Sequence, residues 1–451
     1  MTFHLLNSKK ILKGFTTFGE IPESREIVKT TLHMAWPSVL ESFLVSLTGF
    51  VDTIMVSVLG SAAIAAVGLT TQPKFLGLCI FFALGTAISS IVARRMGEGD
   101  RESANKVLRM ALILAVIFTA IISVTFILGA DFIIDLAGSS PDTHEDAVAY
   151  FVILMIGLIF TSVTLVINAA QRGAGNTKIA MRTNVTSNLV NVVFNYLLIG
   201  GNLGFPALGV RGAAIATVIG TIVGCVMSIV SIVHPSSFIY FKAAKGFFAP
   251  RRDIRSMLNV GSSAFIEQLF MRIGFFLFLM TVANLGTTQL AAHQIGMNFM
   301  SISFSFADGL AVASVALVGR SLGEGRRDMA RLYSSACQRL GIICAVVVSV
   351  LFFFFGRGMF SLFSNDVVIL DYGDMIMKVL CVVIYLQIEQ VVILGCLRGA
   401  GDTKYTAFIS LISVAIIRPG ASWLLCYPLG LGLTGVWLGL CADQLVRFAM
   451  G

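Results

Sequence analysis

Acidic side chains stand inside long apolar stretches of this sequence. The clearest cases are Asp52, Glu267 and Glu389. An ionised carboxylate in the middle of a bilayer costs about 2.5 kcal/mol or more unless it faces a cavity or a partner. Because carboxylates bind cations and exchange protons, these three residues are the first candidates for function.

Asp52 has candidate partners on two segments. Glu41 precedes it by eleven residues, so at about 100° per residue both carboxylates share one helical face. Between residues 179 and 200 a polar stripe recurs at helical spacing, formed by Asn184, Asn188, Asn191 and Asn195. Lipid would penalise such a stripe, so it must face the protein interior. It indicates either hydrogen bonds that join helices or a cavity in which Asn191 and Asn195 hold the Asp52 carboxylate.

A second set lies in the other half of the chain. Tyr385 precedes Glu389 by four residues and shares its helical face. Together with Glu267 these groups could coordinate Na⁺ through oxygen, or the two carboxylates could share one proton. Alternatively a basic residue neutralises either glutamate, the candidates being Arg272, Lys378 and Arg418. Asp308 is a further acid in an apolar segment and a second-tier candidate.

The composition indicates a polytopic membrane protein. Mean hydropathy is +0.89 and only 12% of the residues are charged, whereas a soluble domain needs far more polar surface. Apolar runs of about twenty residues recur, each long enough to cross a hydrocarbon core of about 30 Å. We predict an all-α fold with twelve transmembrane helices, at 32–59, 66–93, 107–129, 147–170, 179–200, 210–233, 258–284, 289–318, 335–356, 373–396, 405–426 and 432–449.

The distribution of lysine and arginine predicts the orientation. The N-terminal tail and alternate loops hold 26 of the 32 basic residues, whereas the segment 129–147 has five acids and no lysine or arginine. The positive-inside rule then puts both termini in the cytoplasm, in the cell's inner (plasma) membrane. The net charge of +8 is a topology signal, and we expect no nucleic-acid partner.

Other chemistry finds little support. The eight cysteines lack CxxC spacing and the five histidines lack ligand spacing, so we expect neither disulfides nor a resident cofactor. No HExxH, GxSxG or phosphate-cradling loop is present, and we expect no enzyme.

The chain repeats itself at an offset of 226 residues. "QRGAGNTK" from Gln171 matches "LRGAGDTK" from Leu397, "VARRMGEGDRESA" matches "VGRSLGEGRRDMA", and Glu41 matches Glu267. A duplicated unit of six helices inserts twice in the same orientation, which predicts two pseudo-symmetric bundles as parallel repeats. We divide the chain into a tail (1–31), an N-lobe (32–233), a linker (234–257) and a C-lobe (258–451). The octapeptide would be a tight turn between a lobe's fourth and fifth helices.

These features resemble the multidrug and toxin extrusion (MATE) family. The similar motifs are "FVDTIMVSVLG", "LRGAGDTK", the two "LGEG" segments and "AAHQI", and the resemblance covers nearly the whole chain from about Ala35. The sequence looks similar to the prokaryotic DinF/NorM-type members of this family. It implies efflux of organic cations or amphipathic drugs in exchange for inward H⁺ or Na⁺ by rocking of the lobes.

The resemblance also implies residue roles. Asp52 matches the family's proton-linked aspartate, and Glu267, Tyr385 and Glu389 resemble the cation site of NorM-type members, with glutamate in place of the usual aspartate at Glu389. Asn195 departs from the DinF-like pattern, in which that position is often aspartate, so one acid is expected there rather than two.

Several other functions are open on the sequence. The closest is a lipid or lipid-linked-oligosaccharide flippase of the same superfamily, which would need basic groups in its cavity, whereas the deep charges here are mainly acidic. A major-facilitator transporter also has six plus six helices, but its loop after the second helix differs from "RRMGEGDRESA". Channel function is also formally possible. We expect a monomer in the lipid bilayer.

Overall fold

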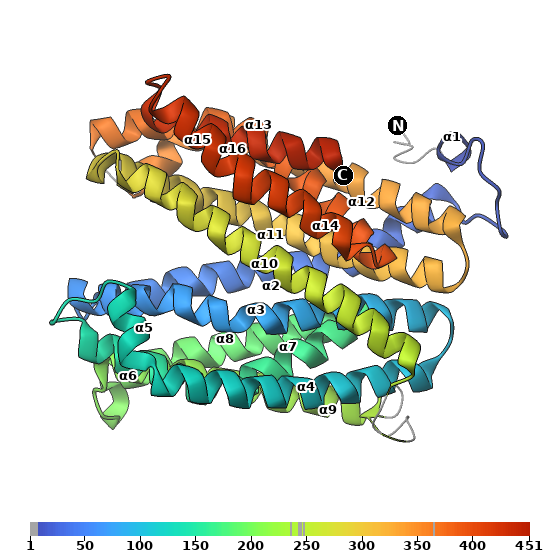
Figure 1. Ribbon diagram of the computed structural model, residues 1–451, viewed down its shortest axis with the longest axis horizontal. Helices are drawn as coiled ribbons and strands as arrows, with labels where there is room; N and C mark the ends of the chain where they lie inside the picture. Colours follow the sequence, from blue (N-terminus) through green and yellow to red (C-terminus); the bar gives the residue numbers. More distant parts are fainter. Residues whose placement is uncertain (1–7, 235–236, 242–245, 247–248, 364–365) are drawn as a thin grey trace. The chain divides into compact units, whose positions relative to one another are not determined.

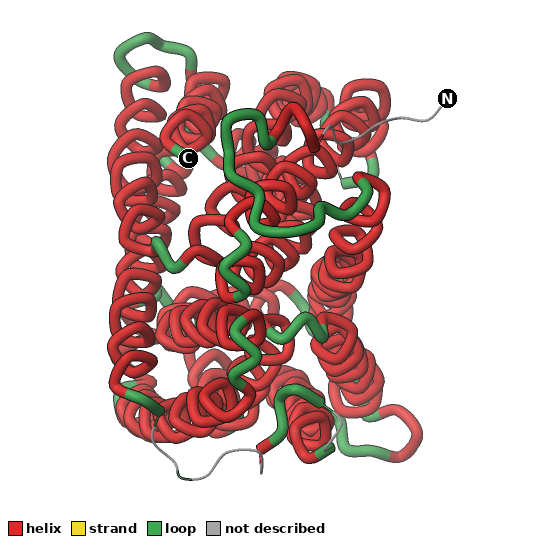
Figure 2. The backbone as a smooth tube through the Cα atoms, turned by 90° about the vertical axis from the view of Figure 1, so that its right-hand side faces the viewer, coloured by secondary structure: helices red, strands yellow, loops and turns green. Residues whose placement is uncertain are grey.

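The computed structural model describes residues 8–234, 237–241, 246, 249–363 and 366–451. All regular elements in these ranges are helical (Figures 1 and 2). They are α1 (Ser8–Ile11), α2 (Ser24–Ser57), α3 (Ser61–Gly97), α4 (Arg101–Leu128), α5 (Ala130–Leu136), α6 (His144–Ile156), α7 (Leu158–Gly173), α8 (Thr177–Ile199), η1 (Asn202–Gly204), α9 (Gly209–Val233), α10 (Arg251–Ala283), α11 (Thr287–Gly323), α12 (Arg327–Ser361), α13 (Val367–Ala400), α14 (Thr403–Ser410), the π-helical η3 (Leu411–Ile417), α15 (Arg418–Cys426) and α16 (Gly432–Met450). Parts of the predicted tail and linker lie outside the described residues.

The helices form two compact units. One is Phe43–Gly261, and the other combines Met1–Ser42 with Ser262–Gly451. The unit boundaries fall inside α2 and α10, so each of these helices contributes residues to both units. The N-lobe (32–233) and C-lobe (258–451) drawn from the duplication divide the chain at different residues, and they stay a prediction about the repeat.

The predicted transmembrane architecture is confirmed. Every predicted span coincides with a helix or a run of adjoining helices. Within the described residues, nine helices are long and apolar enough to cross a membrane, and the pair α6 and α7, bent by 48°, makes a tenth. α8 and α16 are the other two spans. α8 is less apolar than these helices because its asparagine stripe lowers its mean hydropathy.

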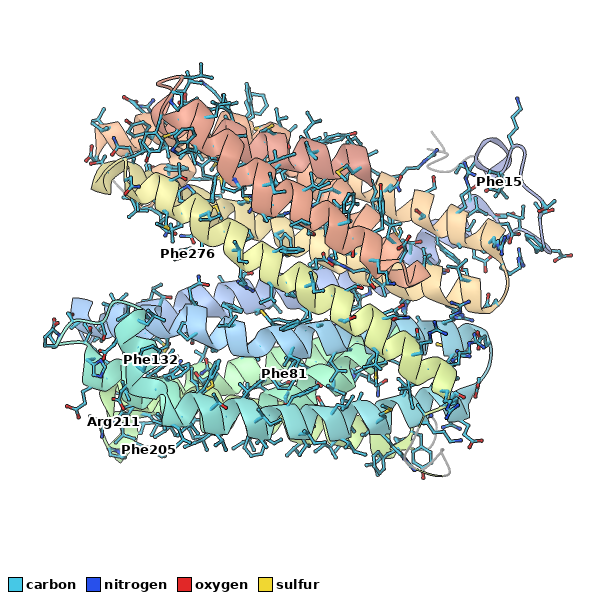
Figure 3. All side chains as sticks on the ribbon, in the orientation of Figure 1. Phe15, Phe81, Phe132, Phe205, Arg211 and Phe276 are labelled. Carbon is cyan, nitrogen blue, oxygen red and sulfur yellow. The ribbon has the colours of Figure 1, made fainter. Side chains whose placement is uncertain are left out.

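Each unit has its own apolar core. In Phe43–Gly261 the fully buried Phe81 and Phe151 lie among aliphatic side chains of α3, α4, α6 and α7. In the other unit Phe360 and Trp437 are buried in the same way. Large apolar side chains also cover the outside of the helices, where lipid replaces water as the solvent (Figure 3).

The repeated octapeptide forms the predicted tight turn twice. Gly175 has a φ of 79° and Gly401 a φ of 86°, in the left-handed region that glycine adopts without steric cost. Gly175 lies between α7 and α8, and Gly401 lies between α13 and α14. Asp402 then caps α14 by accepting a hydrogen bond from the Tyr405 backbone N–H at 3.3 Å.

Close contact between α8 and α9 positions the asparagine stripe. The Ser187 hydroxyl donates to the Gly220 carbonyl at 2.7 Å. A Cβ at Gly220 would lie 2.6 Å from the Ser187 carbonyl oxygen and 3.1 Å from the Asn191 Cβ. Only a residue without a side chain permits this approach, which is the usual way membrane helices pack closely.

This contact predicts that replacing glycine by alanine changes the thermal stability in opposite directions at two positions. Gly220→Ala should destabilise the protein by about 1–3 kcal/mol because the added methyl group overpacks α8 against α9. Gly358→Ala is the matched control, since Gly358 is a helical glycine of α12 with nothing within 4 Å of the new Cβ, and there alanine should stabilise the helix slightly. Thermal unfolding of the two variants in detergent measures this. An equal Tm for both would contradict the packing account.

Candidate functional site

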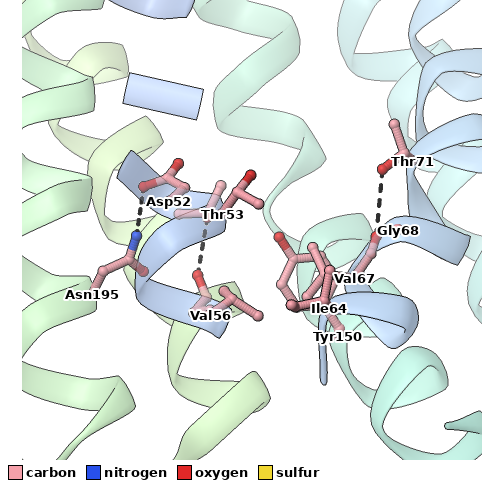
Figure 4. Close-up of a pocket in the computed structure, with 11 residues that line it drawn as sticks. Asp52, Thr53, Val56, Ile64, Val67, Gly68, Thr71, Tyr150 and Asn195 are labelled. Atoms are coloured by element: carbon pink, nitrogen blue, oxygen red, sulfur yellow. Dashed lines mark hydrogen bonds between the residues drawn. The ribbon is translucent and has the colours of Figure 1, made fainter. Parts of the chain in front are cut away.

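Asp52 is held by two amides of α8. Asp52 lies in α2 and is half-buried. Its Oδ1 accepts a hydrogen bond from Asn195 Nδ2 at 2.8 Å (Figure 4). The hydrogen-bond network orients the Asn191 amide with its nitrogen 2.9 and 3.1 Å from the two Asp52 oxygens and its oxygen towards Thr217. Both amides therefore donate to the carboxylate, and charged acceptors make such bonds strong.

The two asparagines are fixed before any ligand binds. Asn191 is 5% exposed and Asn195 is 2% exposed, and they lie one turn apart on the face of α8 that packs on α9. Thr217 of α9 in turn donates to the Ala213 carbonyl at 3.0 Å. The carboxylate is therefore held by a chain of hydrogen bonds that runs from α2 through α8 to α9.

A cavity of about 210 Å³ opens beside Asp52. Asp52 and Asn195 line it together with four residues that carry a hydroxyl group, Thr53, Thr71, Tyr150 and Thr217. Figure 4 labels the first three of these beside Asp52 and Asn195. Its apolar wall consists of Val56, Ile64, Val67 and Ala213. A mainly apolar cavity lined by one carboxylate residue and four hydroxyl residues suits a small ligand with a positive or protonated group.

The other end of the asparagine stripe joins helices. Asn184 Oδ1 accepts a hydrogen bond from Asn168 Nδ2 of α7 at 3.1 Å, and Asn168 Oδ1 accepts one from the Ser228 hydroxyl of α9 at 3.1 Å. Asn188, between the two ends, is half-buried. The stripe thus contains both predicted arrangements, since its first residue joins helices and its last two hold Asp52.

Glu41 and Asp308 lie in the other compact unit. Glu41 is 4% exposed, and the unit boundary after Ser42 separates it from Asp52. Asp308 of α11 is half-buried and accepts a hydrogen bond from the Ser42 hydroxyl at 3.1 Å. Glu41 was grouped with Asp52 because the two residues share one face of α2. They nevertheless belong to different compact units.

Glu267 is neutralised by an arginine. Glu267 is 2% exposed, and Arg398 Nη2 lies 2.5 Å from its Oε1. Thr406 donates to its other oxygen at 3.0 Å. A basic partner was one of the two alternatives for this residue, but the partner is not Arg272, Lys378 or Arg418. It is Arg398, the arginine of the second octapeptide, which lies just before the turn on α13.

Glu389 and Tyr385 have different surroundings. Glu389 is 3% exposed and its Oε1 has no hydrogen-bond partner among the described residues, whereas Tyr385 is 37% exposed. Within the described part of the chain no hydrogen bond links Glu267, Tyr385 and Glu389. Lys378 pairs with Asp374 on its own helix at 2.7 Å.

A buried charge network escaped the sequence analysis. Asp443 of α16 is fully buried between two arginines: Arg418 Nη2 lies 2.5 Å from Oδ2, and Arg447 Nε lies 3.2 Å from Oδ1. Arg447 also donates to the Ser413 hydroxyl of η3 at 3.0 Å, and Arg418 lies over the Phe275 ring at 4.4 Å. The i, i+4 spacing of Asp443 and Arg447 could have predicted the ion pair between these two residues.

The described residues contain no group of three or more histidine, cysteine, aspartate or glutamate side chains placed to hold a metal ion. The Na⁺ site expected at Glu267, Tyr385 and Glu389, which would use two carboxylates and a phenol, stays a hypothesis.

The chain matches a known family over most of its length. The MatE family model matches residues 37–197 and 263–424. The chain is 28% identical over 439 residues to a protein of Thermotoga maritima named "Probable multidrug resistance protein NorM", which covers 97% of this chain and 93% of that protein. It is 27% identical to the "Multidrug resistance protein MdtK" of Yersinia pestis, over 91% of each chain.

Solved structures show the same fold. A crystal structure of MATE in the bent conformation has a TM-score of 0.87 with 23% identity and covers 99% of this chain and 96% of that chain. A crystal structure of MATE in the straight conformation also has a TM-score of 0.87, with 24% identity and 94% coverage of both chains.

The buried network predicts a large stability effect at Asp443. Asp443→Asn would leave two buried guanidinium groups without an anion, which should cost about 3–5 kcal/mol of unfolding free energy. Asp371→Asn is the matched control, because Asp371 pairs with Arg357 where both side chains are exposed, and its Tm should not change. Thermal unfolding in detergent tests this, and equal Tm values for the two variants would show that the network contributes little.

Proposed function

Because this chain belongs to the MatE family, we propose that it is a secondary active antiporter that exports organic cations in exchange for inward H⁺, with Asp52 as the group that binds each in turn. The relatives named above as multidrug resistance proteins support the substrate class. The observation that carries the proposal is the half-buried Asp52 on the wall of a cavity.

Competition for one carboxylate makes the exchange obligatory. An ionised Asp52 attracts a cationic substrate, and a protonated Asp52 does not. When a proton enters from outside and neutralises Asp52, the substrate is released there. After the lobes rock, the proton leaves to the cytoplasm and substrate binds again. A ligand can shift such an equilibrium only through its different affinity for the two states.

The donors around Asp52 favour H⁺ over Na⁺. Asn191 and Asn195 present N–H groups to the carboxylate, and a hard metal cation needs several oxygen ligands instead. In the second candidate site, Glu267 already has a guanidinium as its counter-ion. A proton needs no coordination shell, so it can bind at Asp52 as the site stands.

We further propose that the protein acts as a monomer in the inner membrane. The positive-inside rule predicts that both termini lie in the cytoplasm. A lipid-linked-oligosaccharide flippase is the second candidate. It is less favoured because a pyrophosphate needs several basic groups, and the Asp52 cavity has a carboxylate on its wall.

Removing the charge of Asp52 tests the proposal. Asp52→Asn keeps the shape of the side chain but can neither bind a proton nor attract a cation. We expect it to fold. Its rate of H⁺-driven ethidium efflux from proteoliposomes should fall at least about tenfold, because loss of about 1.4 kcal/mol of attraction between Asp52 and the cation already weakens binding tenfold. A pH gradient alone should drive transport by the wild type, and a Na⁺ gradient alone should not.

Asp374→Asn is the matched control, because Asp374 is an acid of α13 that pairs with Lys378 on the exposed side of its helix. It should transport at the wild-type rate. Normal H⁺-driven efflux by Asp52→Asn would refute the role of Asp52, and transport driven by Na⁺ alone would refute the choice of ion.

A further inference from the structure

A lysine lies close to the Asp52 cavity inside the membrane. Lys74 belongs to α3, well within the span 66–93, and is half-buried. Thr71 and Val67, which line the cavity, precede it by three and seven residues. Residues at these spacings share one face of a helix. Lys74 is therefore the next residue beyond Thr71 on the cavity-lining face of α3.

Lys74 has a charge partner but no contact ion pair. The opposite charges of Lys74 and Asp52 attract each other, and within the described residues no carboxylate lies within ion-pair distance of Lys74. Its Nζ lies 5.9 Å from the centroid of the neighbouring Phe75 ring. A lysine has a flexible stem of four carbons, so its ammonium group can turn towards a ligand in the cavity.

We propose that Lys74 is a cation beside the Asp52 cavity that makes it bind organic cations with an acidic group beside their amine more tightly than simple cations. The proposal rests on the proposed function, since it names the substrate class of the same cavity. The amine would bind at Asp52 and the acidic group at the Lys74 ammonium.

The charge balance supports this preference. With Asp52 ionised, the cavity and Lys74 together carry no net charge. A simple cation adds an uncompensated positive charge, so in a low-dielectric site it binds less tightly than a ligand with no net charge. A zwitterion keeps the sum at zero and pairs both fixed charges. Tyr150, the other titratable group on the wall, is neutral as a phenol and does not alter the balance.

The preference can be measured with two probes that differ in one group. Ciprofloxacin carries an amine and a carboxylate, and its ethyl ester keeps the amine but lacks the acid. Binding of both to the purified protein in detergent should give the wild type an affinity for the zwitterion about tenfold higher than for the ester. Lys74→Gln should abolish that preference, and Lys74→Arg should keep it.

Lys378→Gln is the matched control, because it removes a lysine that is exposed and pairs with Asp374. It should keep the wild-type preference. An equal affinity of the wild type for the two probes would overturn the proposal without any variant, and so would a preference that survives in Lys74→Gln. If Asp52→Asn binds both probes as tightly as the wild type, the role of Asp52 in the proposed function is refuted. This outcome is distinct from failure of the Lys74 proposal, which is judged from the ratio of the affinities for the two probes.

Discussion

The electrostatic cost of an ionised carboxylate inside a membrane protein determines how this cavity is built. Asp52 avoids that cost through amide donors instead of a contact ion pair, since Asn195 donates at 2.8 Å and Asn191 can donate to both oxygens. An arginine in contact would bind the carboxylate too strongly to be displaced by a proton or a cationic substrate. Neutral donors stabilise the charge and still leave it open to exchange.

Glu267 shows the opposite solution in the same chain. Arg398 neutralises it at 2.5 Å, and Asp443 is enclosed by two further arginines. Such pairs hold helices together but are poorly suited to exchange, because removing one partner leaves an unpaired buried charge. Acids of this chain are therefore held in two different ways, Asp52 by neutral amides and Glu267 and Asp443 by arginines.

The sequence predicted the helices well because membrane spans depend on local composition. It also predicted that Asn191 and Asn195 face inwards, since the periodicity of α8 lies within one segment. It did not predict Arg398 as the partner of Glu267, since these residues are 131 positions apart and no local pattern connects them. Whether a buried acid is free or paired depends on tertiary contacts, which composition and spacing do not contain.

The central claim is that proton and substrate compete for Asp52, and proton release on binding tests it most directly. Purified protein in weakly buffered detergent is mixed with tetraphenylphosphonium, and the pH change is recorded at a pH where Asp52 is partly protonated. We expect the wild type to release up to one proton per bound cation and Asp52→Asn to release none. Binding by the wild type without proton release, or equal release by both proteins, would contradict it.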